Sequence, residues 1–397
     1  MRVDVRVGIP KIPTGVGEIE LPFMIMLRGE EASKKPIALV FVIDVSLSMD
    51  GEKIFRAKQG LIEVAKMLSP GDLISIISFC EKVRHEGTYD ARNFVEIESK
   101  IASLKLCPGT NLYEALKAGI DELHKVSEGR LSRLVLVTDG RPTTGVKDKP
   151  KHRKKYEELA KSSPSPIIAI GVGTDYNEKL LGLISRYSGG YFEHVVAADA
   201  LRKVIEEQVI RLSKVVADNV ILRINPSRYV KDVVVPHIKT IKKIGDAVVV
   251  RIPEISVDEP FELVGKFIVD TPEDEGRIRL ATVQVSYREF LKGTRRAEVA
   301  VEVDAVPKEE AEEARPDREV MMKYRLYSIA DELWAAVSAN DRRKVMELLS
   351  SLSDVTLSLG EMELYSTTVD IMEEMRRGGK DALKKLLSAL TKVSKKG

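Results

Sequence analysis

The feature that most constrains the fold of this 397-residue sequence is a series of short apolar runs that alternate with amphipathic helical segments. Residues 38–43 are apolar throughout and are followed by Asp44. Such a run is typical of a strand buried on both faces of a sheet. The same reasoning predicts strands at 73–79, 131–138 and 167–170, and helical spacing predicts helices at 53–68, 93–104, 112–126, 156–162, 178–187 and 198–212. Alternating strands and helices predict an α/β domain at 35–213, with a mostly parallel sheet and helices on both faces.

The pattern changes on both sides of this segment. After residue 215, short alternating runs separated by Pro, Gly and Asp predict an antiparallel β-sandwich over 214–306. Residues 1–34 have the same pattern, so we expect the α/β domain to be inserted into the sandwich. Residues 307–397 lack strand signals and predict a bundle of three or four helices, at 309–338, 342–352, 362–375 and 383–393.

The overall composition excludes several classes of function. Lys and Arg total 63 against 61 Asp and Glu, so no basic excess indicates nucleic-acid binding. No apolar run is long enough to cross a membrane, and the N-terminus lacks the apolar core of a signal peptide. We therefore expect a soluble, cytoplasmic protein with neither nucleic acid nor membrane as partner. Six Asn and three Gln beside many ionic residues fit a thermophile.

The two cysteines, Cys80 and Cys107, are too few for a disulfide framework or a cysteine-rich zinc site. Both are expected near the same end of the sheet, where one bond between them is an alternative. We expect two buried free thiols.

Polar side chains cluster where the predicted strands end. Asp44, Ser46 and Ser48 follow the first strand, Thr110 opens a helix, and Asp139 follows a later strand. Ligands of such sheets lie beyond the carboxyl ends of the strands, at the point where the strand order reverses. Two carboxylates and three hydroxyls form an all-oxygen set that favours Mg²⁺, with Mn²⁺ or Ca²⁺ as alternatives.

This D-x-S-x-S, Thr and Asp constellation resembles the metal-ion-dependent adhesion site of von Willebrand factor A domains. The resemblance covers about residues 35–213, includes the 171–173 glycine loop, and implies a Rossmann-like fold. It implies that the two serines bind the metal directly, Thr110 directly or through water, and the two aspartates largely through water. It also implies a non-enzymatic protein-interaction module, in which an Asp or Glu of a partner protein completes the metal coordination.

Three alternatives stay open at this point. The serines and Thr110 are also ordinary turn and helix-cap residues. A Mg²⁺-dependent phosphohydrolase would use Asp44 as nucleophile, but it normally has a second Asp two residues later, where this chain has Ser46. The chain lacks a P-loop, yet it could serve as an adaptor for an AAA+ ATPase of the chelatase or MoxR type.

Two further segments are candidates for regulation. The basic run at 147–155 follows the Asp139 loop and could steer an acidic partner toward the metal. Thr367 precedes Asp370 by three residues, a spacing that forkhead-associated domains favour after phosphorylation of the threonine. The domain order also resembles archaeal von Willebrand A regulators of archaellum expression. That resemblance implies a signalling phosphoprotein with a forkhead-associated partner and a Ser/Thr kinase.

Overall fold

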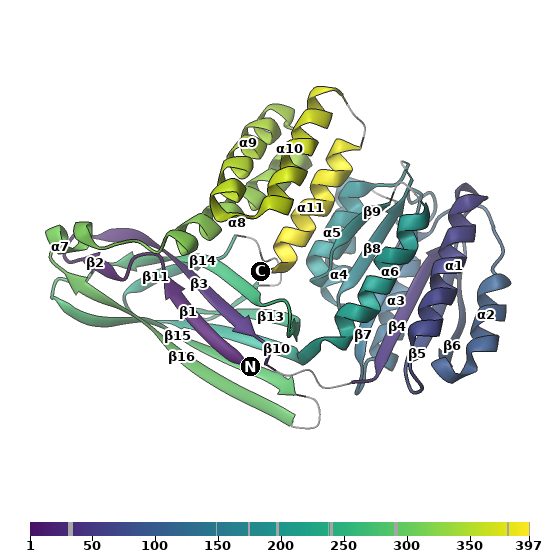
Figure 1. Cartoon of the computed structure of the whole chain (residues 1–397), viewed down its shortest axis with the longest axis horizontal. Helices are drawn as coiled ribbons and strands as arrows, with labels where there is room; N and C mark the ends of the chain where they lie inside the picture. The colour runs from purple at the N-terminus through teal and green to yellow at the C-terminus, as the bar shows by residue number, and fades with distance from the viewer. Residues whose placement is uncertain are drawn as a thin grey trace. The chain divides into compact units, whose positions relative to one another are not determined.

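The computed structural model describes residues 1–30, 35–147, 149–173, 175–195, 198–236, 238, 241–289, 293–378 and 381–396. The chain divides into two compact units (Figure 1). The first unit comprises Met1–Ala32, Val216–Ala382 and Val393–Gly397, and the second comprises Ser33–Val215 and Leu383–Lys392.

The second unit is built on a six-stranded sheet with the order β6-β5-β4-β7-β8-β9. All neighbouring strands are parallel except β6, which pairs antiparallel with β5 at one edge. The strands are β4 (Ile37–Asp44), β5 (Leu73–Phe79), β6 (Val83–Asp90), β7 (Leu131–Thr138), β8 (Ile167–Val172) and β9 (Phe192–Val195). The mostly parallel sheet is as predicted, and β4 lies between β5 and β7, so the loops after β4 and β7 are neighbours.

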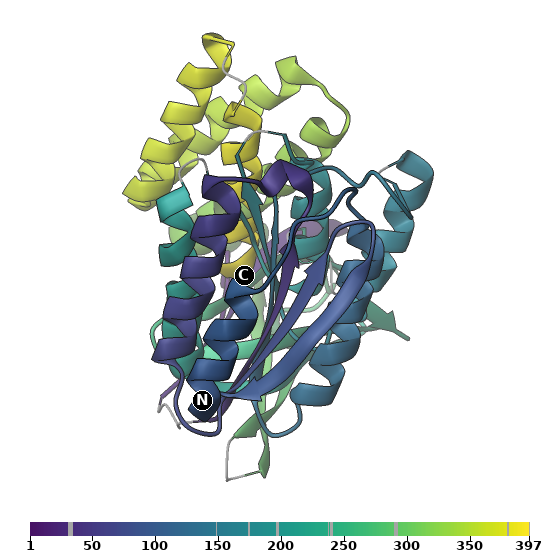
Figure 2. The ribbon, with the colours of Figure 1, turned by 90° about the vertical axis from the view of Figure 1, so that its right-hand side faces the viewer.

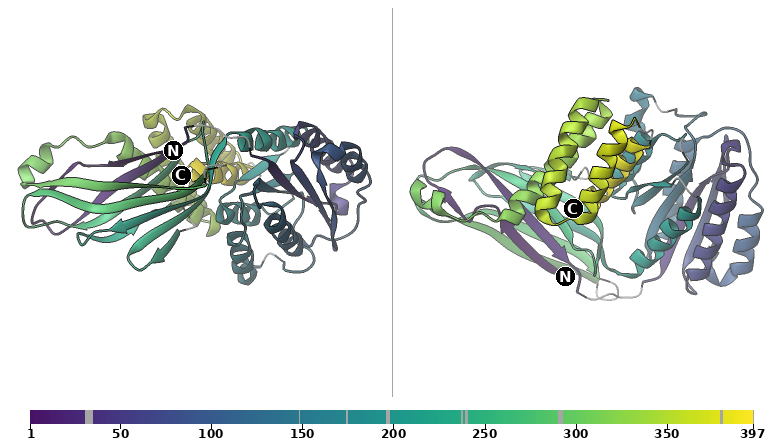
Figure 3. Two further views of the ribbon diagram at one scale, coloured as in Figure 1. Left: turned by 90° about the horizontal axis from the view of Figure 1, so that it is seen from below. Right: turned by 45° about the horizontal axis from the view of Figure 1, so that its top comes forward.

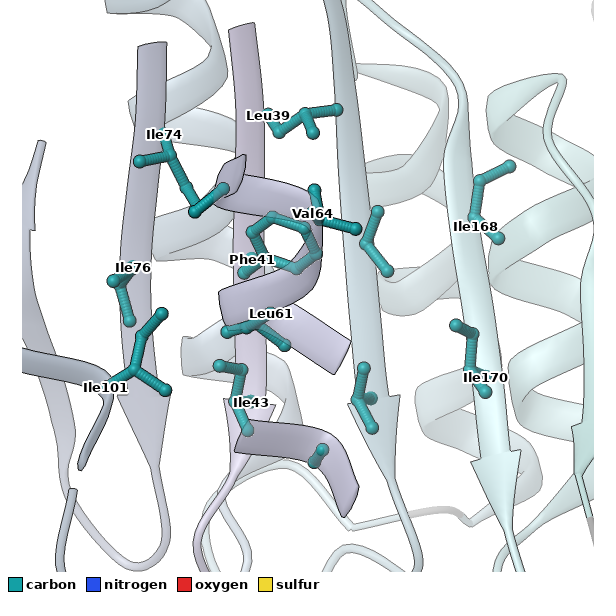
Figure 4. Close-up of a cluster of buried hydrophobic side chains, with 14 of the residues drawn as sticks. Leu39, Phe41, Ile43, Leu61, Val64, Ile74, Ile76, Ile101, Ile168 and Ile170 are labelled. Carbon is teal, nitrogen blue, oxygen red and sulfur yellow. The ribbon is translucent and has the colours of Figure 1, made fainter. Parts of the chain in front are cut away.

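Helices cover both sides of this sheet, as predicted (Figure 2). Leu39, Phe41 and Ile43 of β4 face one side, where Leu61 and Val64 of α1 pack over them (Figure 4). The helices of this side are α1 (Glu52–Met67), α2 (Phe94–Ala102) and α6 (Ala198–Ser213), and those of the other side are α3 (Leu112–Val126), α4 (Pro150–Lys161) and α5 (Glu178–Ser188).

On the other side, α3 approaches β4 and β7 closely at Gly119. A Cβ atom at Gly119 would lie 2.6 Å from side-chain atoms of Leu134 and Val42, so only glycine permits this packing. The close approach fixes α3, and with it the Thr110 loop from which α3 begins, against the strands that carry Asp44 and Asp139.

The first unit is a mostly antiparallel sandwich, in which β2 pairs parallel with β16, and it also has a helical region. Its sheets have the orders β1-β3-β14-β11 and β12-β13-β10-β15-β16-β2, and the long strands β15 and β16 run side by side (Figure 3). The strands are β1 (Arg2–Val7), β2 (Lys11–Pro13), β3 (Glu18–Arg28), β10 (Val215–Pro226), β11 (Val230–Val234), β12 (Ile241–Ile244), β13 (Ala247–Ser256), β14 (Phe261–Asp270), β15 (Gly276–Glu289) and β16 (Gly293–Val306). Because β3 pairs with β14, the predicted insertion of the α/β domain into the sandwich is confirmed.

The C-terminal region is helical, as predicted, but 309–338 is two helices and not one. Pro316 lies in the break, and Asp317 caps the second helix by accepting a hydrogen bond from the Val320 amide at 3.2 Å. The helices are α7 (Lys308–Glu313), α8 (Arg318–Ser338), α9 (Arg342–Leu359), α10 (Met362–Arg376) and α11 (Ala382–Lys396). Within the first unit, α8 packs on β3 and β14.

Helix α11 contributes Leu383–Lys392 to the second unit. There the Thr391 hydroxyl oxygen accepts a hydrogen bond from the Phe192 amide of β9 at 3.1 Å. Lys392 forms an ion pair with Glu193 at 2.7 Å. The helix therefore satisfies a backbone donor at the edge of the sheet, which would otherwise be open to pairing with another strand.

Candidate metal centre

The loop after β4 is folded by its own polar groups. The Ser46 amide donates to Asp44 Oδ1 at 2.8 Å, which turns the chain directly after the strand. Ser46 also forms an isolated parallel bridge with Cys107, and the Cys107 amide donates to the Val45 carbonyl at 2.9 Å. These bonds bring the segment before Thr110 alongside the loop that carries Ser46 and Ser48.

Asp44 is fully buried, and both of its carboxylate oxygens are engaged. The Thr138 hydroxyl donates to Asp44 Oδ2 at 2.5 Å, opposite the Ser46 amide on Oδ1. Burial raises the pKa of Asp44 to about 6; the hydrogen bonds from Ser46 and Thr138 oppose this shift, and the nearby charge of Asp139 adds to it. A carboxylate buried and held at both oxygens is poorly placed to act as the nucleophile of a phosphohydrolase.

Ser46, Ser48 and Asp139 are joined in one hydrogen-bonded chain. The hydroxyl oxygens of Ser46 and Ser48 lie 2.9 Å apart, and the Ser48 hydroxyl donates to Asp139 Oδ1 at 2.8 Å. The Asp139 side chain is fully buried. The structure thus brings together residues that lie 91 positions apart in the sequence.

The position of Thr110 is fixed through its backbone. Its amide donates to Thr143 Oγ1 at 2.8 Å, and its carbonyl accepts from the Thr143 amide at 3.0 Å. The Thr110 side chain is buried. Thr143 follows Asp139 in the loop after β7, so Thr110 is held against the loop that carries the second carboxylate.

Gly140, which follows Asp139, lies beside the side chains of Thr110, Asp44 and Ser48. A methyl group built on Gly140 would lie 3.5 Å from Thr110 Oγ1. The same point is 3.8 Å from Asp44 Oδ2 and from Ser48 Oγ. Oxygens from the loop after β4 and from the Thr110 loop therefore lie within 4 Å of one point beside Gly140, which itself belongs to the loop after β7.

The donor set fits a hard divalent cation. Oxygen ligands from hydroxyls and carboxylates are those that Mg²⁺, Mn²⁺ and Ca²⁺ prefer. No group of three or more His, Cys, Asp or Glu that could hold a metal exists within the described residues. Because this cluster has only two carboxylates, a cation bound here would depend on hydroxyl ligands as well, and it would keep affinity for a further anionic ligand.

The expectation of two free thiols is wrong. Cys80 and Cys107 form a disulfide, with their Cα atoms 5.8 Å apart. Backbone bonds run beside it: the Asn111 amide donates to the Cys80 carbonyl at 2.7 Å. Sequence reasoning placed both cysteines at one end of the sheet but had no means of seeing that the 104–111 segment returns beside β5.

Sequence reasoning also missed three residues that build the centre. Thr138 and Thr143 hold Asp44 and Thr110 by the hydrogen bonds described above. Lys53 forms an ion pair with Asp139 at 2.5 Å. The signal for Lys53 was its place in the first turn of α1, where the helix dipole disfavours a cation unless an anion is near.

Other candidate residues lie apart from this centre. Thr367 is in α10, and its hydroxyl donates to the Glu363 carbonyl at 2.8 Å. Gly171 and Val172 end strand β8, and Gly173 follows with a φ of +77° while its amide donates to the Val195 carbonyl at the end of β9. The basic run crosses the start of α4, and its residue Asp148 lies outside the described residues.

Comparisons with known proteins agree with the fold. The von Willebrand factor type A domain model matches residues 38–207. Inter-alpha-trypsin inhibitor heavy chain H1 of Bos taurus is 30% identical over 173 residues, which are 40% of this chain and 18% of that protein. The chain thus spans less than a fifth of this relative.

Two solved structures resemble nearly the whole chain. The ArnB paralog VWA2 from Sulfolobus acidocaldarius has a TM-score of 0.73 at 20% identity, covering 99% of this chain and 97% of its own. A von Willebrand factor type A protein from Catenulispora acidiphila has a TM-score of 0.74 at 14% identity, covering 92% and 88%. At these identities the likeness concerns the fold.

No helix in the described part of the chain is long and apolar enough to span a membrane.

Domains of the von Willebrand factor type A family are generally modules of protein interaction and not enzymes. The sheet order, the helices on both sides of the sheet and the family match together lead to one conclusion. Residues 38–207 of this chain form a von Willebrand factor type A domain.

Proposed function

We propose that this protein binds a Mg²⁺-type cation at the oxygen centre and uses it to capture an acidic side chain of a partner protein. The proposed ligands are Asp44, Ser46, Ser48, Thr110 and Asp139. The observation that carries the proposal is the convergence of side-chain oxygens from the loop after β4 and from the Thr110 loop, which lie within 4 Å of one point beside Gly140. Mn²⁺ and Ca²⁺ suit the same donors.

The chemistry of the ligands supports capture of a carboxylate. Neutral hydroxyls donate weakly, and two carboxylates supply only as much negative charge as the cation carries. When the aspartates act through water, the metal stays electrophilic and favours a partner's Asp or Glu. The Leu47 side chain between the two serines is 59% exposed and adds apolar surface for such a partner.

A pull-down tests this function. The full chain is immobilised and exposed to a native lysate with added Mg²⁺ or with EDTA, and retained proteins are identified by mass spectrometry. We expect a partner that is retained only with Mg²⁺ and is lost with Asp44→Ala and Ser48→Ala. Ser103→Ala is the matched control, because Ser103 is an exposed serine at the end of α2 whose hydroxyl donates to the Lys100 carbonyl.

Identical partners with Mg²⁺ and with EDTA would contradict the proposal. Circular dichroism of each variant separates loss of binding from loss of fold. Isothermal titration with Mg²⁺ alone then shows directly whether the centre takes up the cation and whether Ser48→Ala weakens that uptake.

The finer proposal is a cytoplasmic regulatory scaffold of the archaeal type. What supports it is the overall fold, which matches the ArnB paralog of Sulfolobus acidocaldarius along nearly the full chain. Phosphorylation of Thr367 by a Ser/Thr kinase, and binding of a forkhead-associated partner there, stay predictions. Because the Thr367 hydroxyl is bonded within α10, recognition of an extended phosphopeptide would require this helix to open locally.

A further inference from the structure

Lys53 reaches into the centre from the first turn of α1. Its ammonium group forms an ion pair with Asp139 Oδ2 at 2.5 Å and donates to the Ser48 carbonyl at 3.2 Å. The Lys53 side chain is 31% exposed, whereas Asp139 is fully buried. A partly solvent-exposed cation is therefore paired with a fully buried carboxylate.

Lys53 also lies against the loop that follows β8. A methyl group built on Gly173 would be 3.4 Å from Lys53 Cε and 3.6 Å from its Nζ. The side chain thus passes over the ends of β4, β7 and β8. Asp139 Oδ1 accepts from the Ser48 hydroxyl, so with Lys53 on Oδ2 both oxygens of this carboxylate are engaged.

We propose that Lys53 is a tethered cation that holds the Asp139 carboxylate in the metal-free protein and competes with the divalent ion for it. The inference rests on the proposed function and deepens it, because it concerns what the same centre does before and after it binds metal. Two carboxylates in one buried centre repel each other, and Lys53 offsets half of their charge while no metal is present.

The same charge tunes the metal-bound state. Asp44 and Asp139 together carry −2, the divalent ion +2 and Lys53 +1. The centre then keeps one net positive charge, which attracts the carboxylate of a partner. Without Lys53 the centre would be neutral, so a divalent ion would bind more tightly and a partner's carboxylate less tightly.

Metal titration of the full chain tests this competition. Isothermal titration with Mg²⁺ and Mn²⁺ is carried out on the wild type, Lys53→Met, Lys53→Arg and Lys66→Met. Lys66→Met removes one positive charge from the same helix about 20 Å away, at 1.5 Å of rise per residue, where Lys66 pairs with exposed Glu63. We expect Lys53→Met to bind each ion about tenfold more tightly. The repulsion between the Lys53 charge and a divalent ion at this buried site is only weakly screened, and the substitution removes it.

The control variants separate charge from shape. Lys53→Arg keeps the charge and should bind metal like the wild type, and so should Lys66→Met. In EDTA, Lys53→Met should melt at a lower temperature than Lys66→Met, because the two carboxylates lose their counter-charge. Added Mg²⁺ should raise the melting temperature of Lys53→Met by more than that of the wild type.

The outcomes distinguish this inference from the proposed function. Equal or weaker metal binding by Lys53→Met, with the wild type binding metal, would overturn the tethered-cation role and leave the metal centre standing. Failure of every protein to bind metal would overturn the metal centre and the competition together.

Discussion

Asp44 is the residue whose protonation most directly links the centre to stability. Its pKa is raised to about 6 in the folded protein, whereas the pKa of an Asp in the unfolded chain is 3.8. The folded protein therefore binds this proton more tightly than the unfolded chain does. Protonation therefore contributes stability that is fully present below pH 3.8 and is lost as the pH rises through 6. A shift of this size corresponds to about 3 kcal/mol.

The prediction concerns the metal-free protein in EDTA. Between pH 4 and pH 7 the free energy of unfolding should fall by about 2.4 kcal/mol more in the wild type than in Asp44→Asn, which does not titrate. Urea denaturation at a series of pH values measures the difference. Parallel pH profiles of stability for the two proteins would show that burial does not raise the pKa of Asp44.

Gly140 permits a test of where the proposed cation binds. In Gly140→Ala the methyl group would lie at ordinary contact distance from its neighbours, so stability should change by less than about 0.5 kcal/mol. The same methyl group occupies the space between three ligand oxygens, so metal binding should be lost. Calorimetric titration and thermal denaturation measure the two effects, and retention of wild-type metal affinity would place the cation elsewhere.

Most of the candidate ligands could be located from sequence because Asp44, Ser46, Ser48 and Asp139 end or follow β4 and β7, and these strands are neighbours in the sheet. Thr110 instead precedes α3, so its place beside them depends on how that helix packs. Lys53, Thr138 and Thr143 could not be predicted with the same ease. Their roles depend on where a side chain reaches within the folded centre: Lys53 extends from a helix, and Thr143 bonds to the backbone of Thr110 33 residues away. Spacing patterns carry no such information.

At the level of elements, the disulfide ties the end of β5 to the segment that carries Thr110. It closes a loop with a sequence separation of 27 residues. Loop-closure entropy predicts that its removal costs about 3.5 kcal/mol. The Cys80→Ala, Cys107→Ala double variant should therefore unfold at lower temperature and bind Mg²⁺ more weakly, because the Thr110 loop loses one of its anchors.

Reducing agent provides the control for that prediction. Dithiothreitol should lower the melting temperature of the wild type toward that of the double variant and leave the variant unchanged. A wild type indifferent to the reductant, at a concentration that mass spectrometry shows to open the bond, would contradict a stabilising role of the disulfide.

Some strands and helices can be predicted from their sequence patterns better than others. The buried strands β4, β5, β7 and β8 could be predicted because both of their faces are apolar. The edge strands β6 and β9 were missed: β6 has no buried residue and is largely polar, and β9 has only four residues. An edge strand is defined by its pairing partner, which a local pattern does not show. In the same way, the pattern of α11 predicts a helix without indicating that Thr391 bonds to β9.

For the whole molecule, two compact units with separate hydrophobic cores should respond separately to mutation. Phe23 of β3 is fully buried and stacks on Phe267 of β14, with ring centroids 4.2 Å apart. Phe23→Ala should destabilise the sandwich by about 3 to 5 kcal/mol.

Metal affinity provides the readout for this independence. Mg²⁺ binding by Phe23→Ala should equal that of the wild type at temperatures where the variant is still folded. Hydrogen exchange should show faster exchange in β3 and β14 and unchanged protection in β4 and β7. Loss of metal affinity in this variant would show that the two units are energetically coupled.

The insertion of the α/β domain has a consequence for synthesis on the ribosome. β3 emerges early, but its partner β14 is made about 230 residues later, because Leu27 is paired with Phe261. At 5 to 20 residues per second the wait is about 10 to 50 s. During that time β3 can pair with β1 but lacks β14, its neighbour on the other side, while the von Willebrand factor type A domain can already fold. The apolar strand β3 and its partner β1 are therefore the segments that a chaperone would have most reason to shield.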